Sequence, residues 1–144
     1  EKDAVYALAK TCSYPIYFLG RLDYADLGPW YEFSDCFLLP SFFDAVPMTV
    51  IESLACGNKV VLTALEGLED FFTENLPTAP IFFVELPPRK NADEIPEEVL
   101  PVFEERLEKQ IAQCMDSEYS KMISMGSLSW DGIAEKVLSY LDFL

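Results

Sequence analysis

Apolar and polar positions along this chain form blocks that predict short strands joined by helices. The run Cys36–Leu39 is short and apolar, and Lys59–Leu62 is a second short run with two β-branched valines, as in buried parallel strands. Between them Pro47 favours a helix start near Met48 or Thr49, because proline fits only the first helical turn. Gly57 supplies the expected helix end. The block therefore predicts one β-α-β crossover.

The same patterns predict the other elements of an α/β fold. Further strands are expected at Pro15–Leu19 and Ala79–Leu86, and helices at Glu1–Lys10, Glu97–Met115 and about Trp130–Leu141. With 144 residues, 51% of them hydrophobic, the chain can bury one sizeable core. We therefore expect a single domain with a Rossmann-like parallel sheet and flanking helices.

Composition removes several classes of function. The chain has no histidine, which argues against Ser-His-Asp or Cys-His catalysis, and it has neither a Gly-rich dinucleotide fingerprint nor a Gly-Lys-Ser/Thr phosphate loop. Its net charge of −15 repels nucleic acid. The four cysteines, Cys12, Cys36, Cys56 and Cys114, form no Cys-x-x-Cys pair, so we expect no metal site and buried, reduced thiols.

Two acidic residues stand at the most informative place in the predicted crossover. Asp44 lies in the loop after the first strand, and Glu52 lies about one turn inside the following helix. Open α/β sheets bind ligands at the carboxyl ends of their strands, and the N–H groups that begin a helix suit a phosphate. In the alternative interpretation both carboxylates have no ligand: Glu52 points to solvent or pairs with Lys59, and Asp44 accepts a hydrogen bond from its own loop backbone.

These residues resemble the donor-binding half of family 4 retaining glycosyltransferases, which have the GT-B fold. The family has a Pro-Ser strand end, a Glu-Gly-Phe-Pro loop, a helix with a second Glu, Ala-x-Gly and a Val-Val strand. This chain has LLPS, FFDAVP, MTVIESLACG and NKVVLT in the same order. Looser similarities lie on both sides, in IYFLGRLDYADLGPWYEFSD, ALEGLEDFF and SLSWDGIAEKVLSYL.

The resemblance implies a role for each candidate residue. Glu52 would accept hydrogen bonds from the nucleotide ribose, and Asp44 would contact the donor sugar. The loop and helix start would offer backbone groups to the sugar and phosphates, through Ala45, Val46, Pro47, Met48 and Thr49. Arg21 would lie close to the nucleotide base, although its place after the Leu19-Gly20 strand end favours a solvated loop arginine instead. The substrate would be a UDP- or GDP-linked sugar, transferred without a metal or other cofactor.

The resemblance also implies that much of the enzyme lies outside this chain. The acceptor domain and the first part of the donor domain would precede Glu1, together with the basic residues that clamp the diphosphate. We therefore expect a partial C-terminal domain of a hexosyltransferase that does not catalyse alone. Its partner would be a glycan or lipid acceptor, as in polysaccharide biosynthesis. The sequence contains no apolar run of membrane-spanning length and no signal-peptide pattern, so we expect a cytoplasmic protein, with a peripheral membrane location of the intact protein as the alternative.

Three departures from the family pattern keep other functions open. Asp44 replaces the usual Glu, Ala45 replaces Gly, and Lys59 stands where Pro is frequent. These changes and the few basic residues support a non-catalytic Rossmann-like interaction module as an alternative. A nucleotide-sugar epimerase or hydrolase with the GT-B fold is the enzymatic alternative.

Overall fold

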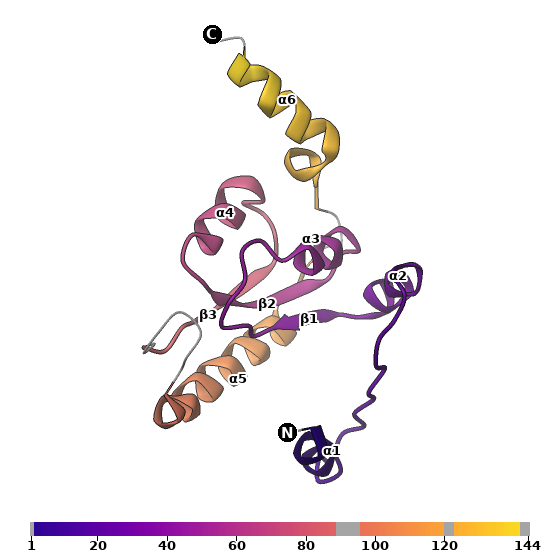
Figure 1. The fold of residues 1–144 in the computed structure, drawn as a ribbon, viewed down its shortest axis with the longest axis vertical. Coiled ribbons are helices and arrows are strands. Elements are labelled where there is room, and N and C mark those ends of the chain that lie inside the picture. Colours follow the sequence, from indigo (N-terminus) through magenta and orange to yellow (C-terminus); the bar gives the residue numbers. More distant parts are fainter. Residues whose placement is uncertain (1, 89–95, 120–122, 142–144) are drawn as a thin grey trace.

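The chain folds around a three-stranded parallel sheet with helices on both faces (Figure 1). The computed structural model describes residues 2–88, 96–119 and 123–141. The strands β1 (Cys36–Leu39), β2 (Lys59–Ala64) and β3 (Ile81–Glu85) lie side by side in chain order. Their register aligns Leu38 with Val61 and Val61 with Phe82. This arrangement confirms the predicted Rossmann-like α/β class and is consistent with a GT-B domain.

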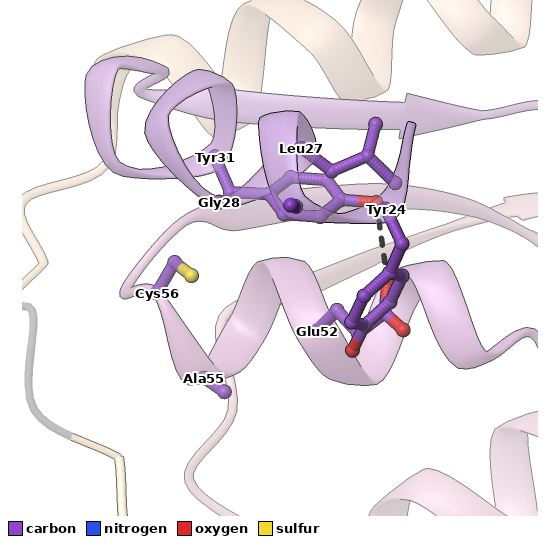
Figure 2. Close-up of a pocket in the computed structure, with 8 residues that line it drawn as sticks. Tyr24, Leu27, Gly28, Tyr31, Glu52, Ala55 and Cys56 are labelled. Atoms are coloured by element: carbon purple, nitrogen blue, oxygen red, sulfur yellow. Dashed lines mark hydrogen bonds between the residues drawn. The ribbon is translucent and has the colours of Figure 1, made fainter. Parts of the chain in front are cut away.

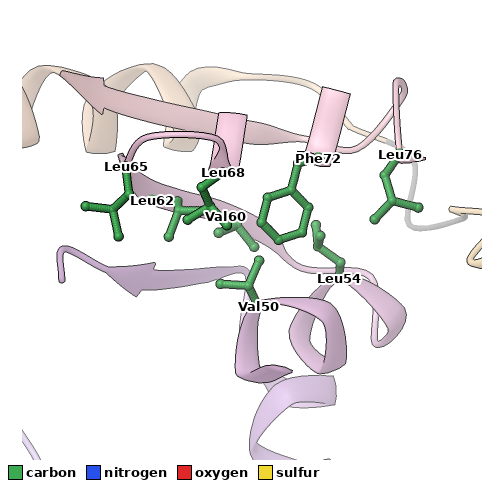
Figure 3. Close-up of a cluster of buried hydrophobic side chains, with 8 residues drawn as sticks. All are labelled: Val50, Leu54, Val60, Leu62, Leu65, Leu68, Phe72 and Leu76. Carbon is green, nitrogen blue, oxygen red and sulfur yellow. The ribbon is translucent and has the colours of Figure 1, made fainter. Parts of the chain in front are cut away.

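One face of the sheet is covered by α3 (Met48–Ala55) and α4 (Leu68–Asn75) (Figure 1). Both helices pack apolar side chains against the central strand β2, and the buried residues of this layer form one cluster (Figure 3): Val50, Leu54, Val60, Leu62, Leu65, Leu68, Phe72 and Leu76. Removing so many apolar side chains from water is the main stabilising contribution available to a domain of this size. The cluster fixes α3, which carries the candidate residue Glu52, against the sheet.

The crossover forms where its proline and glycine signals predicted. The first strand ends before Pro40, and α3 begins directly after Pro47. The helix ends at Ala55, and Gly57 adopts a left-handed φ of 86° while its N–H bonds the Leu54 carbonyl at 2.9 Å. A residue with a Cβ tolerates this backbone conformation poorly, which explains glycine at the helix end. The strand, helix and strand predicted from residue 36 to residue 62 are confirmed.

The opposite face of the sheet is covered by α5 (Leu100–Asp116), which a short 3-10 turn, η1 (Glu97–Val99), precedes. Val61, Val84, Phe103 and Cys114 form its buried cluster. The Sγ atoms of Cys36 and Cys114 lie 3.2 Å apart, so two cysteines distant in sequence meet in this layer. Burial, followed by the hydrogen bond with Cys114, raises the pKa of the Cys36 thiol to about 12. Both thiols are free.

The predicted burial of all four cysteines is confirmed in full only for Cys114, and it is plainly wrong for Cys12. Cys114 is buried, Cys36 and Cys56 are half-buried, and Cys12 is exposed. The reason is its position: Cys12 follows α1 (Lys2–Ala9), a helix that contains no buried residue and stands away from the sheet (Figure 1). The helix expected at the start of the chain is thus confirmed, but it does not contribute to the core.

The strand expected at Pro15–Leu19 was also wrong. These residues run irregularly between α1 and α2 (Tyr24–Phe33), and all of them are exposed. The apolar pattern satisfies the local requirement for a strand, but the described residues include no neighbouring strand for this segment to join. At the other end, η2 (Gly126–Leu128) leads into α6 (Trp130–Leu141), the last predicted helix, which projects away from the sheet (Figure 1).

Candidate functional site

Glu52 lies in a pocket of about 390 Å³ between α2 and α3 (Figure 2). The side chain is half-buried on the α3 face that points toward α2. Residues of these two helices and of the turn after α3 line the pocket: Tyr24, Ala25, Leu27, Gly28, Tyr31, Glu52, Ala55 and Cys56. The pocket is mostly apolar, with a carboxylate and two tyrosine hydroxyls as its polar side-chain groups. Small-molecule sites are typically of this size and character.

Tyr31 bonds Glu52 across the pocket. Its hydroxyl donates to Glu52 Oε2 over 3.5 Å, which is long for an O–H···O hydrogen bond and therefore weak (Figure 2). The tyrosine ring packs edge-on against the ring of Phe37 in β1, with the centroids 5.7 Å apart. Burial, and then the negative charge of Glu52, raise the pKa of Tyr31. The hydroxyl therefore stays protonated and remains a donor to the carboxylate.

Asn58 holds the two helices of the pocket together. Its Nδ2 atom donates to the main-chain carbonyl of Tyr31 at 2.8 Å and to Ser53 Oγ at 3.0 Å. Tyr31 belongs to α2 and Ser53 to α3, so one side chain connects both helices. Asn58 and Ser53 are almost fully buried, with exposed fractions of 1% and 0%. The gap between the helices is therefore fixed by buried hydrogen bonds as well as by packing.

Lys59 does not pair with Glu52, so the alternative in which the glutamate forms an ion pair with this lysine was wrong. The lysine Nζ instead donates to the carbonyls of Met115 at 3.4 Å and Ser117 at 3.2 Å. These carbonyls lie at the end of α5, where free carbonyl groups and the helix dipole attract a positive charge. The Glu52 carboxylate consequently faces the pocket without a cation from Lys59.

The loop before α3 stands apart from this pocket. Asp44, Ala45 and Val46 are exposed, and none of them is among the lining residues. Pro47 is buried and stands at the N-cap of α3, where it provides no side-chain hydrogen bond. The uncapped helix start therefore presents N–H groups to the side where Met48 and Thr49 are exposed.

Comparison with known families identifies the class of protein. Residues 1–105 match the family described as Glycosyl transferases group 1. The chain belongs to this glycosyltransferase family. No curated protein and no solved structure matches the chain. The matched region contains the whole crossover, the pocket and both acidic candidates, so the candidate site belongs to the glycosyltransferase part of the chain.

The glycosyltransferase structure thus gathers only part of the predicted site. Glu52 lies in the pocket, whereas Asp44 and the loop residues lie outside its lining. Arg21 is exposed after Gly20 and is likewise not a lining residue. No basic side chain occurs among the eight residues that line the pocket. The residues brought to Glu52 come instead from α2.

Sequence reasoning missed Tyr31 and Asn58 in this glycosyltransferase. Tyr31 precedes Glu52 by 21 positions, and the two approach only because α2 packs beside α3. Asn58 could have been noticed, because an amide directly after the helix-ending Gly57 and before a buried strand must find buried partners. For Tyr31 the sequence offers no comparable signal.

Among the described residues, no group of three or more His, Cys, Asp or Glu side chains could hold a metal ion. Within the same residues, no helix has the length and apolar character needed to cross a membrane.

Proposed function

We propose that this chain is the donor-binding segment of a family 4 retaining glycosyltransferase that uses a UDP- or GDP-linked hexose without a metal. The observation that carries the proposal is the half-buried Glu52 carboxylate in the pocket between α2 and α3. A carboxylate only accepts hydrogen bonds, so its natural ligand is a group with two neighbouring hydroxyls. The ribose of a nucleotide has such a pair.

The rest of the pocket suits a nucleoside. Tyr24 and Tyr31 provide aromatic surface beside the carboxylate, and a planar base can pack on such rings (Figure 2). The volume of about 390 Å³ is in the range of small-molecule sites. In this proposal the ribose binds Glu52, and the base lies along α2, with Arg21 beyond the pocket near the base.

The diphosphate and sugar would extend from the pocket toward the start of α3. The uncapped N–H groups at Met48 and Thr49 suit a phosphate, and Asp44 with Ala45, Val46 and Pro47 would contact the sugar. During transfer the bond between the sugar carbon and the diphosphate breaks. A bond from that carbon to a glycan or lipid hydroxyl forms with the same configuration, and the nucleoside diphosphate takes up the hydroxyl proton.

A leaving diphosphate needs positive charge, which this pocket does not contribute. Lys59 is engaged with the end of α5, and the chain carries a net charge of −15. We therefore place the basic clamp and the acceptor site in other parts of the enzyme. In this proposal residues 1–144 form a partial C-terminal donor domain that binds nucleotide sugar but does not catalyse transfer alone.

Calorimetric titration of the whole enzyme with UDP-glucose and GDP-mannose tests the proposal. Glu52→Gln keeps the shape but removes the charge, so we expect about ten- to hundredfold weaker donor binding. Gly28→Leu should abolish binding, because Gly28 lines the pocket and a leucine there would fill it; a Cβ at this position meets no atom within 4 Å, so we expect the variant to fold. Gly28→Ala is the matched control, which adds a single methyl group to the same position. Unchanged binding in Glu52→Gln would refute the assignment.

The exposed position of Asp44 favours one second candidate, a non-catalytic module that keeps the fold of the family. Asp44 lies outside the pocket lining, so its carboxylate contributes to donor recognition only where the donor sugar reaches the loop before α3. Failure of the folded whole protein to bind either nucleotide sugar would support this candidate. Donor binding with release of an altered free sugar would instead indicate the epimerase or hydrolase alternative.

A further inference from the structure

Tyr31 is held from three directions. Its ring packs edge-on against Phe37 of β1, with the two ring planes 73° apart. Its main-chain carbonyl accepts the 2.8 Å hydrogen bond from the buried Asn58 side chain. Its hydroxyl reaches Glu52 Oε2. The orientation of Tyr31 is therefore set by the strand and by the turn after α3 before any ligand binds.

Glu52 is less constrained. Its backbone is fixed in α3, but the long side chain has several rotatable bonds and is only half-buried. Among the described residues, the Tyr31 hydroxyl is the donor that the structure shows for the Glu52 carboxylate. The nearest candidate cation along the chain, Lys59, is bonded to α5 instead. The Tyr31 hydroxyl is thus the polar group that orients the carboxylate.

We propose that Tyr31 is a positioning residue for the donor, acting through Glu52, and that Asn58 anchors it. The inference rests on the proposed function, because Glu52 must be the group that binds the donor. The tyrosine hydroxyl occupies one lone pair of Oε2, so the other oxygen and the remaining lone pair face incoming hydroxyls. At 3.5 Å the bond is long enough that the carboxylate can adjust to a ligand with little loss.

The buried Asn58 oxygen supports the anchoring role. Asn58 Oδ1 has no hydrogen-bond partner among the described residues, although the side chain is only 1% exposed. A buried amide with an unpaired carbonyl is unfavourable for stability by itself. The favourable contribution of Asn58 comes from its two donated hydrogen bonds, to Tyr31 in α2 and to Ser53 in α3. Asn58 thus fixes the separation of the two helices and the main chain of Tyr31, while the contact with Phe37 orients the ring.

A double-mutant cycle in the whole enzyme tests the positioning role. The variants are Tyr31→Phe, Glu52→Gln and the pair together, with donor affinity measured calorimetrically and transfer measured with the donor that binds. Tyr31→Phe keeps the ring against Phe37 and removes only the hydroxyl. We expect about three- to tenfold weaker donor binding and a KM raised to match, with kcat within about twofold, because the ribose contact is the same before and during reaction.

The decisive result is the coupling between the two residues. If Tyr31 acts through Glu52, Tyr31→Phe should have no further effect once Glu52 is glutamine. Tyr14→Phe, which removes a hydroxyl from a tyrosine that is 78% exposed and outside the pocket lining, is the matched control. An unchanged Glu52→Gln enzyme would refute the proposed function itself. A weakened Glu52→Gln enzyme with additive or absent effects of Tyr31→Phe would overturn only the positioning role.

Discussion

The packed body of this glycosyltransferase and its N-terminal arm differ in burial although both are rich in apolar residues. The body comprises the sheet with α3, α4 and α5, and it contains both buried clusters. The arm, residues 2–23, contains no fully buried residue. Its large apolar side chains are exposed instead: Val5, Tyr6, Leu8, Tyr14, Ile16, Tyr17, Phe18 and Leu19. Apolar sequence therefore becomes core only where another element faces it.

The contacts that the arm does make are local. The rings of Tyr6 and Phe18 lie 4.3 Å apart, and the residues of α1 and the following segment border an apolar pocket of about 420 Å³. In the body, by contrast, β2 is paired on both edges and covered on both faces. We infer that the free energy of unfolding of the described chain resides almost entirely in the body.

Two leucines of equal chemistry give the strongest test of this comparison. Leu54 in α3 is 1% exposed, whereas Leu19 in the arm is 45% exposed. Leu54→Ala should lower the free energy of unfolding by about 2–5 kcal/mol, because it removes buried contacts and leaves a cavity. Leu19→Ala should cost less than about 0.5 kcal/mol. Urea unfolding followed by circular dichroism measures both, and equal losses would show that the arm is packed in solution.

The same contrast explains which elements the sequence predicted. The strand Cys36–Leu39, the helix from Met48 and the strand from Lys59 were all correct, because proline and glycine mark their ends within a few residues. Pro15–Leu19 has equally apolar residues, but a strand is defined by hydrogen bonds to a neighbour that local pattern does not reveal. The helix α4 was missed, although Gly67 followed by Glu69 and Asp70 is a helix-start signal.

The candidate site was predictable only in part for the same reason. Glu52 follows from its place on an apolar helix after a strand end, which is a local property. Tyr31 and Asn58 become part of the site through tertiary contacts. The short spacing between Asp44 and Glu52 in the sequence likewise says nothing about whether both carboxylates face one pocket, and the structure leaves Asp44 outside it.

Asn58→Ala tests whether the Asn58 side chain holds α2 to the packed body. The substitution removes both donated hydrogen bonds and leaves the Tyr31 carbonyl and Ser53 hydroxyl without that donor, so we expect a loss of about 1–3 kcal/mol. Helix α2 should then detach from α3, and limited proteolysis should cut faster between residues 24 and 35. Ser34→Ala is the control, because the Ser34 hydroxyl bonds Trp30 within the same helix segment. Unchanged proteolysis in Asn58→Ala would contradict the proposed anchor.

The thiols of the two regions allow the finest test, which uses pH. Burial and the contact with Cys114 raise the pKa of Cys36 in the body to about 12 from an ordinary 9.0, whereas Cys12 in the arm is exposed. Above about pH 9 the unfolded chain loses the Cys36 proton and the folded chain keeps it. The free energy of unfolding is therefore fully retained below pH 9 and falls as pH rises toward 12.

We expect this fall to be less than about 1.4 kcal/mol per pH unit, the limit for one proton, because Cys36 is only half-buried. Urea unfolding of reduced protein at pH 8, 9.5 and 10.5 measures it. Tyrosines and lysines also titrate in this range, so the informative quantity is the difference between variants. Cys36→Ala should flatten the decline, and Cys12→Ala should leave it unchanged. If the free energy of unfolding fell with pH as steeply in both variants as in the natural protein, the Cys36 thiol would not be coupled to folding. The difference between body and arm would then not extend to their thiols.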